Sequence, residues 1–146
     1  MSNSQDLSFE DVTVGATLPP YSVELTLQRL VMEAGANRDF APAHFDRELA
    51  RAEGRQDVFA NTMLLQTLFE VMLRQWMGPA GRIRKLGLRM HAMNYADQTL
   101  SAHGAVTKCI AGRASGTVEL EIWQQTPAQG KTVTGKAVVE LPLRER

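Results

Sequence analysis

The sequence predicts an α+β fold in which an antiparallel sheet wraps around one long central helix. Ten of the 17 residues from 61 to 77 are apolar. That is more than one helix face can hold, so this helix should be mostly buried. After residue 80 the apolar residues alternate along four successive segments, as they do on one face of a strand. A sheet with one apolar face needs a cover, and the buried helix supplies it.

The first elements of the chain should be short. We expect an extended piece over residues 12–18 that ends in a turn at Pro19–Pro20. A helix should follow Thr26, which is a good N-cap, because apolar residues then recur at helical spacing as far as Ala34. Gly35 favours the end of that helix.

A loop should separate this helix from the next one. Pro42 disfavours helical geometry in the residue before it and has no amide hydrogen, so residues 38–44 are predicted to form a loop. Asp46 is suited to cap a short helix over residues 47–53, and Gly54 suits its end.

The second half of the chain should hold the central helix and the sheet. The helix begins at Asn61, runs to Met77 and ends at Gly78–Pro79. Because the links between the strands are short and contain turn residues, each strand should pair antiparallel with the next. The expected strands cover residues 86–92, 100–106, 118–122 and 133–141.

Length and composition exclude several classes of protein. With 146 residues the chain fits a single domain, 1–146. Lysine plus arginine equals aspartate plus glutamate at 16 each, which argues against a nucleic-acid partner. The only cysteine, Cys109, rules out an internal disulfide and a cysteine-rich zinc site, and it should be a small packed residue. No apolar run is long enough to span a membrane, and the polar N-terminus lacks a signal core, so we expect a cytoplasmic protein.

Asp39 and His44 are the candidate catalytic residues. They lie five residues apart on the proline-containing loop, where a carboxylate and an imidazole can converge on one small molecule. The spacing alone also fits a second interpretation, in which Asp39 organises the turn and His44 lies beside a helix start. His91 and His103 fall inside predicted strands, where surface or cross-strand roles are expected, and the sequence shows no metal-binding pattern.

One concentration of basic residues stands out, at residues 82–85 together with Arg89. It fits either a solvated strand edge or a contact for the phosphates of a carried group. On the second interpretation the candidate substrate-binding residues are Arg84, Lys85 and Arg89.

Residues 34–46 resemble the hydratase motif of the MaoC-like hotdog proteins, the (R)-specific enoyl-CoA hydratases. The family pattern is Asp, any residue, Asn, Pro, an aliphatic residue and His, with an acid two residues later. Ala41 replaces the Asn, and Asn61–Thr62 replaces the His-Gly that starts the central helix in the family. The resemblance covers about residues 10–142 in the same order. The matching motif residues are Asp39, Pro42, His44 and Asp46.

Both replacements are also found in a subgroup, the small subunits of the steroid side-chain enoyl-CoA hydratases, whose members pair with a second MaoC-like chain. The segments that resemble this subgroup are residues 38–40, 44–47, 58–61, 76–79 and 83–89.

The resemblance implies a hotdog fold and an enzyme that adds water reversibly to a trans-2-enoyl-CoA, giving a (3R)-3-hydroxyacyl-CoA. Asp39 and His44 would hold the water and act as base and acid, and the backbone amide of Thr62 would stabilise the thioester oxyanion. No separate cofactor is implied, because CoA is part of the substrate. The partner would be a second hotdog chain, in a homodimer or a heteromer.

The subgroup resemblance also implies a bulky or steroid acyl group. The methionines of the central helix, Met63, Met72 and Met77, would suit the wall of such a pocket, or they would simply fill the core. Two alternatives to the hydratase remain: a hotdog acyl-CoA thioesterase, and a structural subunit that stabilises an active hydratase partner.

Overall fold

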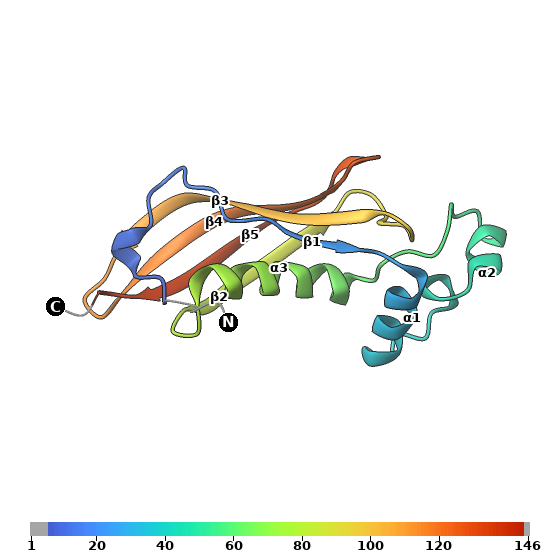
Figure 1. Cartoon of the computed structure of the whole chain (residues 1–146), viewed down its shortest axis with the longest axis horizontal. Coiled ribbons are helices and arrows are strands. Elements are labelled where there is room, and N and C mark those ends of the chain that lie inside the picture. The colour runs from blue at the N-terminus through green and yellow to red at the C-terminus, as the bar shows by residue number, and fades with distance from the viewer. Residues whose placement is uncertain (1–5, 145–146) are drawn as a thin grey trace.

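A curled antiparallel sheet packs on one long helix in this protein, as a computed structural model of residues 6–144 shows (Figure 1). Helix α3 (Thr62–Met77) lies along the concave face of the sheet. The shorter helices α1 (Leu27–Ala36) and α2 (Arg47–Ala52) lie beyond the N-terminal end of α3. The predicted α+β arrangement of a sheet around a central helix is therefore confirmed. Two 3-10 turns complete the helical elements, η1 (Phe9–Asp11) and η2 (Pro42–His44).

The sheet has five strands in the order β1-β3-β4-β5-β2. The predicted pairing of each strand with the next is therefore wrong at one place, because β2 pairs with β5 and not with β3. The β3–β4 and β4–β5 links are tight hairpins, whereas residues 91–98 between β2 and β3 can carry the chain to the other side of the sheet. The strands are β1 (Tyr21–Glu24), β2 (Arg82–Met90), β3 (Thr99–Ala111), β4 (Ser115–Thr126) and β5 (Gly130–Pro142).

The first extended piece also differs from the prediction. Residues 12–18 do not form a regular strand: they contain an isolated bridge, between Thr17 and Ala105, and share three backbone hydrogen bonds with β3, and the first strand begins at Tyr21. The positive φ of Gly15, 89°, turns the chain within this segment, which explains why it does not continue as a strand.

The core lies between α3 and the inward face of the sheet. The buried side chains of α3 are Leu64, Leu65, Leu68, Phe69, Met72, Leu73 and Met77, which confirms that this helix is mostly buried. They form one cluster with inward-facing residues such as Leu100, Leu120 and Val139. Among the described residues, no helix is both long enough and apolar enough to cross a membrane.

Side-chain caps fix where the helices begin. The hydroxyl of Thr26 accepts from the Arg29 amide at the start of α1, and a carboxylate oxygen of Asp46 accepts from the Leu49 amide at the start of α2. At α3 the side-chain oxygen of Asn61 accepts from the Leu64 amide at 3.0 Å. All three helix starts agree with the sequence prediction.

Buried amides attach the beginning of α3 to the sheet. The Gln124 side chain on β4 donates from Nε2 to the carbonyl of Leu65 at 2.7 Å. Just before the helix, the Ala60 amide donates to the carbonyl of Asn94 at 2.9 Å. The Thr132 hydroxyl donates in turn to the Asn94 side chain at 2.6 Å. Because these groups are buried, breaking the bonds would leave polar atoms unsatisfied, so the position of the helix start is strongly constrained.

The close pairing of β5 with β2 gives a test of the register. A Cβ added at Gly135 would lie 2.2 Å from the backbone oxygen of Gly87, whereas a Cβ at Gly87 would meet no atom within 4 Å. We expect Gly135→Ala to push the two strands apart and to lower the free energy of unfolding by about 1–3 kcal/mol. Urea unfolding measures this loss, with Gly87→Ala as the matched control. Equal losses in the two variants would contradict the register.

Candidate active site

The loop after α1 turns sharply and directs Asp39 toward the start of α3. Arg38 has a φ of 55°, in the left-handed region that few residues other than glycine adopt. The next amide, that of Asp39, donates back to the carbonyl of Ala34 at 2.9 Å. A strained backbone of this kind is often found at functional sites, where the surrounding structure holds it in place.

His44 reaches the same point from η2. Its Nδ1 lies 2.8 Å from the carbonyl oxygen of Phe59. Because a carbonyl can only accept, Nδ1 carries the hydrogen, and Nε2 is the ring nitrogen that faces the carboxylate. The distance from Nε2 to Asp39 Oδ2 is 3.3 Å. The structure thus brings together the two residues that the sequence singled out.

The pair is partly shielded from solvent and borders a small hollow. The side chain of His44 is 12% exposed and that of Asp39 is 35% exposed. The Phe59 ring packs edge-on against the imidazole, with centroids 4.6 Å apart. The hollow beside the pair measures about 290 Å³ and is also lined by Thr62 and Met63. A water molecule and the reacting end of a larger molecule can therefore reach both groups.

Asn61 is a site residue that the sequence analysis treated only as a departure from the family. It is buried, and its Nδ2 donates to Asp39 Oδ2 at 3.1 Å while its oxygen caps α3. One side chain therefore fixes both the helix start and the orientation of the carboxylate. Asparagine is an ordinary N-cap, so only its position at the end of the family motif could have pointed to this second role.

Thr62, whose backbone amide the resemblance assigns to the oxyanion, lies at the start of α3. Thr62 is the first residue of α3, so its N–H has no carbonyl one turn earlier in the helix to bind. It lines the same hollow as Asp39 and His44. The partial positive charge at a helix N-terminus suits an oxygen that gains negative charge. Its role as an oxyanion donor stays a prediction.

The three candidate substrate-binding cations do not join this site. Arg84 Nε donates to Glu140 Oε2 at 2.6 Å, and this hydrogen bond lowers the pKa of Glu140. Lys85 is exposed on β2 opposite Val138. Arg89 lines a different hollow, on the outer face of the sheet.

The three methionines proposed as a pocket wall are separated by the fold. Met72 and Met77 are 1% and 0% exposed and fill the core, as the alternative interpretation held, while Met63 is 51% exposed and lines the hollow beside Asp39 and His44. The central helix presents one methionine to the site because its other two point toward the sheet.

A second hollow of about 480 Å³ lies between α1 and the start of α3, where Met32 and Leu64 line it. Glu33 also lines this hollow, and burial raises the pKa of its carboxyl group. Glu33 accepts a hydrogen bond from Asn37, which lies two residues before Asp39. Within residues 6–144, no group of three or more histidine, cysteine or acidic side chains is placed to hold a metal ion.

Comparison with known proteins supports the resemblance. A curated relative from Mycobacterium tuberculosis, the 3-oxo-4,17-pregnadiene-20-carboxyl-CoA hydratase beta subunit, is 36% identical over 94 residues, which are 64% of this chain and 73% of the relative. The ChsH1–ChsH2 complex of the same organism contains a similar chain, with a TM-score of 0.80 and 29% identity over 88% of this chain and 98% of that one.

The fold is shared more widely. An (R)-hydratase of A. caviae involved in PHA biosynthesis aligns with a TM-score of 0.82 and 24% identity over 91% of this chain and 99% of that one. No family model matches the sequence.

Fold and relatives together define a hotdog protein of the hydratase class. The chain belongs to the MaoC-like hydratase family, and its sequence resemblance to the steroid side-chain subgroup is confirmed. The hotdog fold and the assignment to a family of enzymes are confirmed with it.

The double role of Asn61 can be tested by separating its two hydrogen bonds. Asn61→Ala removes both bonds and should lower the free energy of unfolding by about 1 kcal/mol, because the cap is lost. Asn61→Ser keeps a capping oxygen but cannot donate an amide hydrogen to Asp39, so its stability should stay close to wild type. Urea unfolding compares them, and an equal loss in both variants would show that capping is not what Asn61 contributes to stability.

Proposed function

We propose that this chain adds water reversibly to the double bond of a trans-2-enoyl-CoA and forms a (3R)-3-hydroxyacyl-CoA. The observation that carries the proposal is the 3.3 Å approach of Asp39 Oδ2 to His44 Nε2, beside a hollow that Thr62 also lines. Such an addition needs three groups: a proton acceptor, a proton donor and a hydrogen-bond donor to the oxyanion.

The proposed chemistry uses one water held by Asp39 and His44. The Asp39 carboxylate takes a proton from the water as its oxygen bonds to C3 of the substrate. The electron pair of the double bond moves toward the thioester carbonyl, and C2 then takes a proton from the protonated Nε2 of His44. Because the two side chains lie 3.3 Å apart, the proton on Asp39 can return to His44 and restore the starting state.

Two further groups support these roles. The Asn61 amide donates to the Asp39 oxygen nearest to His44, which orients the carboxylate. The Thr62 amide would donate to the thioester oxygen, where negative charge gathers during the addition. Removing a donor of this kind commonly slows an enzyme about 10²–10³-fold.

The acyl group in this proposal is bulky, in line with the steroid-derived substrate that the name of the curated relative gives for that protein. The hollow of about 480 Å³ between α1 and the start of α3 is a second space that such an acyl group could occupy. Exposed Met32 lines this hollow and exposed Met63 lines the hollow beside Asp39 and His44, and both offer flexible apolar surface that adapts to irregular shapes.

The proposed partner is a second hotdog chain. Phe40 is 69% exposed next to Asp39, and Met63 and Met90 add exposed apolar surface around the site. Strands β1 and β2 each pair on one side only, and such edges are usually covered. The similar chain in the ChsH1–ChsH2 complex and the relative named as a beta subunit support a partner of this kind.

The catalytic roles predict a large loss of activity without loss of the fold. Asp39→Asn and His44→Gln should each lower the rate of crotonyl-CoA hydration by about 10²–10⁴-fold, because each removes one proton-transfer group. Both residues lie on a loop outside the main core, so circular dichroism should be unchanged. Near-wild-type hydration by either variant would remove the pair from the mechanism.

The double variant should lose much less than the product of the two single losses, since both groups act on one water. Release of free CoA, measured with a thiol reagent in the same assay, separates hydration from thioester hydrolysis. CoA release that outpaces hydration would favour the thioesterase.

The substrate proposal predicts an order of preference. We expect kcat/KM to be highest for a ring-bearing enoyl-CoA, lower for a long linear one and lowest for crotonyl-CoA, because buried apolar area adds about 25 cal/mol per Å². The panel is measured with the chain alone and with any hotdog chain that co-purifies with it. If the four-carbon substrate is best in both preparations, the bulky-substrate proposal is wrong and a general hydratase remains.

A further inference from the structure

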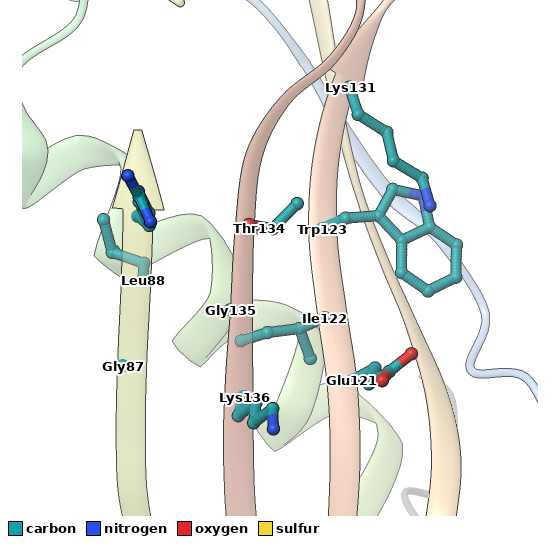
Figure 2. A pocket seen from close by; sticks show the side chains of 10 residues that line it. Gly87, Leu88, Glu121, Ile122, Trp123, Lys131, Thr134, Gly135 and Lys136 are labelled. Atoms are coloured by element: carbon teal, nitrogen blue, oxygen red, sulfur yellow. The ribbon is translucent and has the colours of Figure 1, made fainter. Parts of the chain in front are cut away.

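The outer face of the sheet, turned away from α3, carries a hollow of about 560 Å³ where β2, β5 and β4 lie side by side (Figure 2). In Figure 2 helix α3 lies behind the strands, so the labelled side chains are seen from outside. The hollow extends over Gly87, where an added Cβ would meet no atom within 4 Å. Gly87 faces outward on β2 and pairs with Lys136 on β5. Because glycine has no side chain, the space over Gly87 stays open.

The hollow has a strong excess of positive charge. Arg89, Lys131 and Lys136 line it, against one carboxylate, that of Glu121. None of these three cations takes part in an ion pair within residues 6–144, unlike Arg84, which is held by Glu140. Three cations that line one open space are suited to phosphate groups.

The hollow also contains an aromatic ring. The Lys131 ammonium lies over the Trp123 indole, 4.6 Å from the ring centroid (Figure 2). The indole is held in place by His103, which stacks against it at 5.6 Å with an interplanar angle of 7°. A purine base can replace Lys131 on the indole while the ammonium pairs with a phosphate, so ring and cations together match a phosphorylated nucleoside.

The hollow begins one residue away from the candidate active site. Arg89 and Met90 are consecutive on β2, and their side chains point to opposite faces of the sheet. Arg89 lines the outer hollow, while Met90 lines the catalytic hollow, with its sulfur 3.5 Å from the Thr62 hydroxyl. Since β2 is an edge strand that ends at Met90, a flexible chain can pass around that end from one face to the other.

We propose that Trp123, Lys131, Lys136 and Arg89 bind the 3′-phosphorylated adenosine diphosphate end of the CoA substrate, while the thioester lies at Asp39 and His44. This inference rests on the proposed hydratase function for its substrate. The pantetheine arm would cross the end of β2, so the edge strand separates the part of the substrate that reacts from the part that is only held. Arg89 would thus make the phosphate contact that the sequence suggested, and Arg84 would not.

The test compares two thioesters of the same crotonyl group, one on CoA and one on N-acetylcysteamine, which lacks the nucleotide. In Lys131→Gln/Lys136→Gln the ratio of kcat/KM for the CoA thioester to that for the N-acetylcysteamine thioester should fall at least about tenfold, through a higher KM for the CoA thioester. Lys108→Gln, an exposed lysine of β3, is the matched control and should leave the ratio unchanged. An unchanged ratio in the double variant would overturn the proposal.

If the chain hydrates neither thioester, calorimetry still tests nucleotide binding. Adenosine 3′,5′-bisphosphate should bind to the wild-type chain, and the binding should be lost in the double variant and kept in Lys108→Gln. Failure of hydration with retained bisphosphate binding would contradict the proposed function but not the nucleotide site. Equal binding of AMP, which lacks the 3′-phosphate, would show a general nucleotide site instead of a CoA site and would overturn the assignment, as would the absence of bisphosphate binding.

Discussion

The fixed position of the α3 N-terminus is the constraint on which the rest of the site depends. The helix cannot shift along its axis, because its apolar side chains fill the core and the buried amide of Gln124 holds the Leu65 carbonyl at 2.7 Å. At this fixed point Asn61 uses one side chain for two purposes, a cap for the helix and a hydrogen bond to Asp39. The Asp39 carboxylate is therefore positioned by the same residue that caps the central helix.

The loop that carries Asp39 and His44 is held in place at both ends. Arg38 adopts its left-handed conformation at the end of α1, and the imidazole of His44 is held through Nδ1 by the carbonyl of Phe59, just before α3. A further link is made by Arg47 on α2, which donates to Asp57 and Asp97 and so joins α2 to the segment before α3 and to the β2–β3 link. These contacts allow a loop to hold two reactive groups at a fixed separation although most loops are mobile.

Much of this arrangement could be predicted from the sequence. The near-continuous apolar character of residues 61–77 identified the buried helix, and Thr26 and Asp46 marked the starts of the two shorter helices because capping is a local interaction. The pairing of β2 with β5 could not be predicted, since strand alternation gives the face that each residue occupies but not the neighbouring strand. The second hydrogen bond of Asn61 and the burial of Met72 are likewise set by tertiary contacts between distant segments.

In the proposed reaction, Asp39 and His44 act together on one face of the substrate. Hydration of crotonyl-CoA by the wild-type chain in D2O tests it directly, with the product examined by proton NMR and by chiral chromatography. Because the two groups lie 3.3 Å apart, the hydroxyl at C3 and the deuterium at C2 should be added to the same face, giving one diastereomer of the (3R)-3-hydroxy product. A product with the two groups on opposite faces, or a mixture of diastereomers, would contradict the account.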